Sequence, residues 1–188
     1  MFDKLVVSFL VDEVVGGFFI SVPPGHVACI YDRGRGVLAK IWGPGLHLKL
    51  PFWQVAKLFN AQTLEYAITK DFDVEEAKEA LGDEPIIATT QDGRTIQIEG
   101  TILLRLNKEG ASEIWESIGE NIVSKVVRPV SRSRIRSVVS NFAAEEVISS
   151  RRDEVEERIR AELIKVLDDR GIIIEKMLLS DVRTINRI

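Results

Sequence analysis

The stretch that decides the fold is "GVLAKIWGPGLHLKLPFW", residues Gly36–Trp53. A glycine-proline-glycine turn at residues 43–45 separates two apolar runs, and the second run alternates leucines with His47 and Lys49. A period of two is typical of a β-strand with one apolar face. The stretch therefore predicts a β-hairpin, with the leucines on one face and His47 facing solvent on the other.

Further strands are predicted on both sides of this hairpin. "HVACIYD", residues 26–32, returns through the glycine-rich turn "DRGRG", which suits a hairpin connection. Residues 54–69 supply one or two more strands. The pair Asp92-Gly93 lies between β-branched runs and predicts another β-hairpin.

The second half of the chain is helical until near its end. Residues 110–142 predict two helices separated at Pro129, because proline cannot continue a helix in its interior. A long helix follows from Arg151 to Arg170 and ends at Gly171; its apolar stripe is Val155, Ile159, Leu163 and Val166. "IIIEKMLLSDV", residues 172–182, predicts a final strand. Hairpins, helices and a strand in this order indicate an α+β fold.

The N-terminal 22 residues are predicted to associate with a membrane. Leu5–Val22 has about the length of a spanning helix, but Asp12 and Glu13 each cost roughly 2.5–3.5 kcal/mol at a bilayer centre. An amphipathic, tilted or interfacial anchor fits better. A buried first helix, or two strands divided at Gly16-Gly17, are the alternatives. The candidate membrane contacts are Leu5, Val6, Phe9, Leu10, Phe18, Phe19, Phe52 and Trp53.

An acidic segment interrupts the strands. Residues 71–85, "DFDVEEAKEALGDEP", hold seven acids against Lys78, which is typical of a solvated excursion. We expect a short helix near residues 74–81. This segment motivates a second hypothesis, a soluble adaptor or regulatory module that docks a basic partner there and folds residues 1–22 into its core.

The sequence offers no catalytic constellation. No phosphate-binding glycine loop or nucleophile elbow is present, neither His26 nor His47 has an evident carboxylate partner, and Cys29 sits in an apolar strand, as a core residue would. A net charge of -4 argues against nucleic-acid binding. We expect no enzymatic activity, no cofactor and no metal.

Charge is segregated in the helical half. Lys125, Arg128, Arg132 and Arg136 recur at helical intervals, whereas residues 145–169 are predominantly acidic. Surfaces of opposite sign on one small domain can steer copies into head-to-tail association. Two solvated faces, or pairing within one molecule, are the alternatives. The candidate interface residues are Lys125, Arg128, Arg132, Arg136, Glu154, Glu156 and Glu157.

Several blocks resemble SPFH-domain (band 7) proteins, the superfamily of stomatins, prohibitins, flotillins and the HflK/HflC pair. They are "VPPGHVACIYDRGRGV", "GPGLHLKLPFWQ", "SIGENI" and "VVRPVSRSRIRSVVSNFAAEEVISSRRDEVEERI". The prohibitin branch is the most similar, and the likeness covers roughly Val22–Val182.

The resemblance implies a non-enzymatic scaffold at a cell or organelle inner membrane, assembled from copies of itself or a paralogue. In this family such assemblies delimit membrane patches and restrain a membrane-anchored AAA+ protease. It also implies a division into a membrane-associating segment 1–22, an SPFH1-like subdomain 23–84, an SPFH2-like subdomain 85–182, and the start of a C-terminal helix at 183–188. The leucines at 46, 48 and 50, with Phe52 and Trp53, would contact a membrane or neighbour; core packing is the alternative for the leucines.

Overall fold

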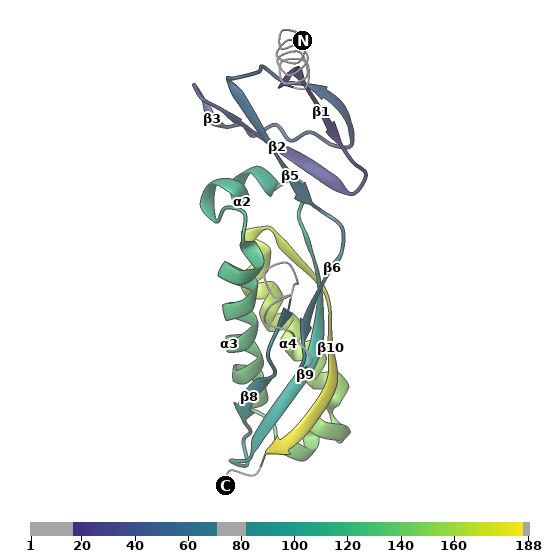
Figure 1. The fold of residues 1–188 in the computed structure, drawn as a ribbon. Helices are drawn as coiled ribbons and strands as arrows, with labels where there is room; N and C mark the ends of the chain where they lie inside the picture. Colours follow the sequence, from purple (N-terminus) through teal and green to yellow (C-terminus); the bar gives the residue numbers. More distant parts are fainter. Residues whose placement is uncertain (1–16, 71–81, 186–188) are drawn as a thin grey trace, which may run out of the picture. The chain divides into compact units, whose positions relative to one another are not determined.

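The computed structural model describes residues 17–70 and 82–185, which form two compact units (Figure 1). The first unit comprises the chain up to Gln62 together with Leu106–Gly119, and the second comprises Thr63–Arg105 and the chain from Glu120 onward. The first division therefore falls at Gln62 and not at residue 84, because the strand that follows Thr63 pairs with the central strand of the second unit.

Within its described residues, the first unit contains two small sheets and the helix α2 (Ala111–Ser117). In the three-stranded sheet, β2 (His26–Asp32) lies between β3 (Gly36–Val37) and β5 (Gln54–Asn60), and all pairs are antiparallel. The two-stranded sheet pairs β1 (Phe19–Val22) with β4 (Gly45–Leu48). Helix α2 contributes buried Ala111 and Ile114 to the core, and buried Cys29 is a core residue as expected.

The hairpin predicted for Gly36–Trp53 does not form. Its two strands, β3 and β4, belong to different sheets: β3 completes the expected glycine-rich hairpin with β2, and β4 pairs with β1. Residues 19–22, expected within the N-terminal helix, are this partner strand. The pattern was correct for strands, but pairing is decided by tertiary partners that periodicity does not contain.

The second unit is built on a mixed sheet with order β10-β9-β6-β7, and β8 also pairs with β9. Its members are β6 (Leu64–Ile68), β7 (Gly82–Asp83), β8 (Ile86–Thr89), β9 (Thr95–Leu106) and β10 (Ile172–Ile185). Burial alternates strictly along β9, and its three isoleucines, with Leu104 and Leu106, are buried. The expected hairpin around Asp92-Gly93 joins β8 to β9, and Gly93 has φ 78°.

Two helices pack on the sheet of the second unit, one of them against the long strand β10 and the other against β8 and the first helix (Figure 1). They are α3 (Arg128–Val139), preceded by a π-helical turn (Val123–Val127), and α4 (Arg152–Leu167), preceded by another (Glu146–Ser150) and followed by a 3-10 turn (Asp168–Arg170). Val155, Ile159 and Leu163 of α4 are buried as expected, and Leu167 takes the buried position predicted for Val166. Gly171, with φ 70°, ends the last turn as expected.

Two expectations about chain breaks need correction. Pro129 does not separate two helices: it lies in the first turn of α3, directly after the π-helical turn Val123–Val127, and the chain turns at Gly119 instead, with φ 88°. Residues 183–185, expected to begin a helix, continue strand β10.

Within the described residues, no helix combines the length and the apolar character that crossing a bilayer requires.

Candidate membrane-contact site

The first unit exposes a group of large apolar side chains that a folded core would normally cover. Phe52 is 77% exposed and Leu46 is 70% exposed. Single exposed apolar residues are common, but several from neighbouring segments mark an interaction surface. We call this group the apolar corner, and its members are Phe18, Phe19, Leu46, Leu48, Leu50, Phe52 and Trp53.

Strand pairing brings part of the apolar corner together. Phe19 of β1 lies directly opposite Leu48 of β4, and Leu46 is two residues further along the same face. Cross-strand neighbours have Cβ atoms about 5 Å apart, so these three side chains form one apolar surface. The opposite face of the pair is turned inward, where Val22 is buried.

A tight turn presents the aromatic end of the apolar corner. The Gln54 N–H donates to the Leu50 carbonyl oxygen at 2.9 Å, and the Leu50 N–H donates to Gln54 Oε1 at 3.0 Å. Within this loop Phe52 has φ 61°, a conformation that a bulky residue rarely adopts. A strained residue that is also exposed is characteristic of functional surfaces.

The buried carboxylate of Asp32 connects this loop to the glycine-rich turn. Its Oδ1 accepts from the Gly34 N–H at 3.0 Å, and its Oδ2 accepts from Arg35 Nη2 at 3.0 Å and from Gln54 Nε2 at 3.1 Å. The hydrogen bond from Arg35, with that from Gln54, holds the pKa of Asp32 well below its usual range. Asp32 therefore positions the turn that carries Phe52.

His47 lies on the inner side of β4, and its expected exposure to solvent is wrong. Its ring stacks on Trp42 with centroids 5.1 Å apart, and its Nε2 lies 2.7 Å from the Gly43 carbonyl oxygen. The alternation of the strand was predicted correctly, but the leucines face outward and His47 faces inward. Core packing, the alternative considered for Leu46, Leu48 and Leu50, is excluded by their exposure.

The candidate membrane residues divide by position in the chain. Leu5, Val6, Phe9 and Leu10 lie outside the described residues, as do the expected helix at 74–81 and most of the acidic segment. Phe18, Phe19, Phe52 and Trp53 are exposed. Their contact with a membrane stays a prediction.

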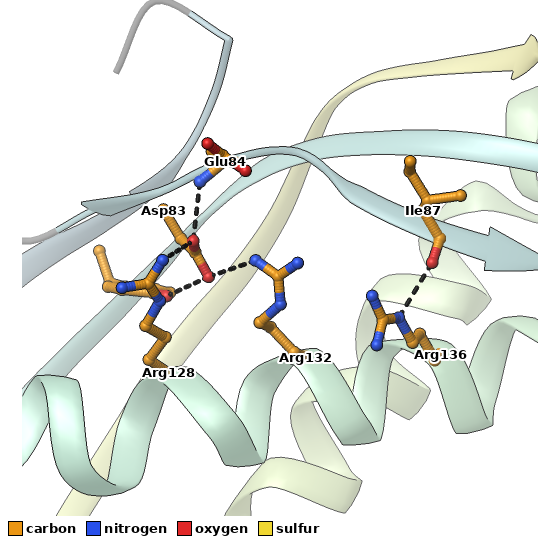
Figure 2. Close-up of polar contacts among 7 residues, drawn as sticks. Asp83, Glu84, Ile87, Arg128, Arg132 and Arg136 are labelled. Carbon is orange, nitrogen blue, oxygen red and sulfur yellow. Dashed lines mark hydrogen bonds and ion pairs between the residues drawn. The ribbon is translucent and has the colours of Figure 1, made fainter. Parts of the chain in front are cut away.

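A second polar cluster lies within the second unit, around the fully buried carboxylate of Asp83 (Figure 2). Arg128 Nη2 donates to its Oδ1 at 2.6 Å, and Arg132 Nη1 donates to its Oδ2 at 2.7 Å. The Tyr66 hydroxyl donates to Oδ2 at 3.2 Å, and the Glu84 N–H donates to Oδ1 at 2.8 Å. Asp83 thereby fastens β7 to α3.

The electrostatics of this cluster follow from its geometry. Burial alone would raise the pKa of Asp83, but the hydrogen bonds from Arg128, Arg132 and the Glu84 backbone outweigh it, so the pKa is lowered. Burial, together with the neighbouring Asp83 charge, raises the pKa of Tyr66. The cluster is an ion pair with a hydrogen-bonded phenol, without a nucleophile or a proton acceptor near neutral pH.

The candidate interface residues of α3 and α4 already make contacts within the second unit. Besides the Asp83 pairs, Arg136 Nε donates to the Ile87 carbonyl oxygen at 2.9 Å (Figure 2). On α4, Glu156 Oε1 accepts from the Leu179 N–H at 2.8 Å, and Glu154 and Glu157 pair with arginines three residues away. Their role between subunits stays a prediction.

Sequence reasoning missed Asp32 and Asp83. Asp83 was placed in the solvated acidic segment, which is wrong for this residue because the fold buries its side chain. A usable signal was the spacing of Arg128 and Arg132, four residues apart on one helix face, which suits one shared carboxylate. For Asp32 the signal was an aspartate immediately before a glycine-rich turn.

The chain is similar to proteins of one known family. The model of the SPFH domain / Band 7 family matches residues 20–187. Prohibitin 1 of Gallus gallus is 29% identical over 138 residues, 73% of this chain and 45% of its own length. Prohibitin 1 of Drosophila melanogaster is 24% identical over 167 residues, 89% of this chain and 54% of its own. "Prohibitin-7, mitochondrial" of Arabidopsis thaliana is 22% identical over 157 residues, 84% of this chain and 49% of its own.

The chain spans about half the length of the curated relatives that it matches. The family match covers nearly all residues from β1 to β10, the same residues that build both units. This chain therefore belongs to the SPFH domain / Band 7 family.

Proposed function

We propose that this chain is a non-enzymatic scaffold subunit that docks on a bilayer through its N-terminal segment and its apolar corner. Prohibitin-like members of the family are in general membrane scaffolds, and nothing in the described residues suggests catalysis. The observation that carries the proposal is the apolar corner itself: seven large apolar side chains exposed by two strands and one strained turn. Water is a poor environment for such a surface, and a bilayer is a good one.

The rest of the proposal concerns assembly. Copies of the chain, or of a paralogue, would associate through the charged faces of α3 and α4 into a ring or cage at the membrane. Such an assembly would organise membrane proteins, for example an AAA+ protease. Support for this part comes from charge segregation and from the family resemblance.

Vesicle flotation tests the docking step. The whole chain should float with phosphatidylcholine vesicles, and the double variant Phe52→Ser/Trp53→Ser should partition about tenfold or more weakly, because each fully buried large apolar side chain contributes roughly 1.5–3 kcal/mol. Ile87→Ser is the matched control, since Ile87 is an exposed apolar residue of the second unit.

High salt separates apolar docking from charge attraction. The Debye length falls to about 3 Å at 1 M salt, so flotation that depends on the apolar corner should persist there. Equal flotation of the whole chain and of the Phe52→Ser/Trp53→Ser variant would contradict the role given to the apolar corner.

A further inference from the structure

The segment that builds the apolar corner is basic, although the whole chain has a net charge of -4. Within residues 17–62 Asp32 is the one acid, and its side chain is buried. The basic residues of this segment are Arg33, Arg35, Lys40, Lys49 and Lys57. Positive charge is therefore concentrated in the same segment as the exposed apolar side chains.

Two of these basic residues form backbone hydrogen bonds with residues of the apolar corner. The Arg33 N–H donates to the Trp53 carbonyl oxygen at 3.0 Å, and a Cβ added at the next residue, Gly34, would lie 3.5 Å from Trp53 Nε1. Lys49 lies between the exposed leucines 48 and 50, its side chain is half-buried, and its N–H donates to the Phe18 carbonyl oxygen at 2.7 Å. Across residues 17–70 and 82–185, neither Arg33 nor Lys49 has an ion-pair partner.

Apart from Asp32, the described acids of the first unit, Glu109, Glu113 and Glu116, belong to its later segment Leu106–Gly119. Glu113 and Glu116 are exposed on α2, which packs against β2. Strand β3 begins directly after the turn that contains Arg33 and Arg35. These three acids are therefore in a different segment of the chain from the apolar corner.

We infer that the apolar corner docks on an anionic bilayer, with Arg33 and Lys49 contacting lipid phosphates around the inserted aromatic side chains. The inference rests on the proposed function and specifies its lipid. Guanidinium and ammonium groups bind phosphate oxygens, and tryptophan settles at the headgroup level, where its ring is in an apolar layer and its N–H in a polar one.

Two alternatives fit less well: residues 1–16 as the source of a preference for anionic lipid, and a second copy of the chain as the partner of the apolar corner. Residues 1–16 carry three acids against Lys4, so they would oppose binding to anionic lipid. A second copy docked corner to corner would bring like charges together, which is unfavourable. An anionic bilayer complements both the exposed apolar side chains and the basic side chains of the site.

The test compares vesicles of phosphatidylcholine alone with vesicles that also contain phosphatidylserine, using the whole chain at low salt. We expect partitioning to rise at least tenfold with the anionic lipid. In the Arg33→Gln/Lys49→Gln variant each lost charge should weaken partitioning into the anionic vesicles by about fivefold, so that most or all of the gain disappears. The control Arg170→Gln/Lys176→Gln removes the same charge from exposed positions of the second unit and should keep the gain.

The outcomes separate this inference from the proposed function. No gain with phosphatidylserine, or a gain that survives in Arg33→Gln/Lys49→Gln, overturns the inference, while the proposed function stands if neutral vesicles still bind through Phe52 and Trp53. The inference is also overturned if the control Arg170→Gln/Lys176→Gln loses as much of the phosphatidylserine gain as Arg33→Gln/Lys49→Gln does. If the Phe52→Ser/Trp53→Ser variant binds both vesicle types as the parent does, the proposed docking fails as well.

Discussion

At the scale of single residues, Asp83 shows how one buried charge holds an element in place. Its carboxylate is inaccessible to solvent, while the Arg128 side chain is 49% exposed and Arg132 is 29% exposed. Removing the carboxylate charge leaves two cations that water can reach, whereas removing an arginine would leave a buried anion partly unpaired. The second change is the more costly of the two.

We predict that Asp83→Asn destabilises the second unit by about 1.5–3 kcal/mol, the range for hydrogen bonds to charged groups. Because the pKa of Asp83 is lowered in the folded state, its contribution is present above its ordinary value of 3.8 and is lost as pH falls below it. Urea unfolding at pH 7 and at pH 3 measures both effects. The stability gap between parent and variant should be larger at pH 7, and a gap that grows in acid would contradict the assignment.

Gly100 provides a second prediction at this scale. A Cβ there would lie 2.5 Å from the Leu178 backbone oxygen, so Gly100→Ala must push β9 and β10 apart. We expect a loss of roughly 1–3 kcal/mol in thermal or urea unfolding, as for other overpacked sites. Gly43→Ala is the control, because no atom lies within 4 Å of its added Cβ; equal stability of the two variants would show that the strands can separate freely.

At the scale of elements, α4 covers the outer edge of β10. Arg152 Nη2 donates to the Leu179 carbonyl oxygen, the Leu179 N–H donates to Glu156 Oε1 at 2.8 Å, and Arg160 Nε donates to the Glu175 carbonyl oxygen at 3.2 Å. An uncovered edge strand can pair with other chains. The charges of α4 thus serve the fold before any role between subunits.

Hydrogen exchange tests whether the side chains of α4 protect the backbone of β10. In Glu156→Ala the Leu179 amide loses its acceptor, and we expect its exchange to accelerate about tenfold or more relative to the parent chain, since an opened amide is no longer protected. Glu157→Ala is the control, because the Glu157 side chain pairs with Arg160 and is 68% exposed. Unchanged exchange at Leu179 would mean that this hydrogen bond contributes no protection.

The sequence predicted the elements better than their partners. Alternation along residues 46–50 and the glycine at 171 indicated a strand and a helix end correctly, since both depend on local geometry. The prediction that His47 is on the solvent-facing side of β4 was wrong. Alternation shows that the two faces of a strand differ, but it does not show which face the fold covers. Asp83 was missed because burial of its charge depends on Arg128 and Arg132, 45 and 49 residues away along the chain.

At the scale of the whole molecule, the proposed assembly through α3 and α4 would have to use charges that the fold leaves available. Arg128 and Arg132 are engaged with Asp83, so reversing their charge would disturb the fold as well as any interface. Glu154 and Glu157 are better probes, because their side chains are 49% and 68% exposed.

We predict that Glu154→Lys/Glu157→Lys lowers the mass of the assembled species, measured by light scattering after size exclusion at low salt. Removing attractive charges between surfaces weakens association and reduces its dependence on salt. Glu109→Lys/Glu116→Lys makes the same charge change in the first unit and should leave the mass unchanged. Identical masses for parent and test variant would exclude these acids from the subunit interface.

The most direct measurement of the central claim is quenching of Trp53 fluorescence by lipids with brominated acyl chains. The whole chain and a Trp53→Phe variant are each mixed with such vesicles, and the difference between them isolates Trp53 from Trp42 and Trp115. If the apolar corner enters the bilayer, the Trp53 emission shifts to shorter wavelength and is quenched. If its emission and intensity stay the same while the chain floats with the vesicles, the apolar corner does not contact the membrane.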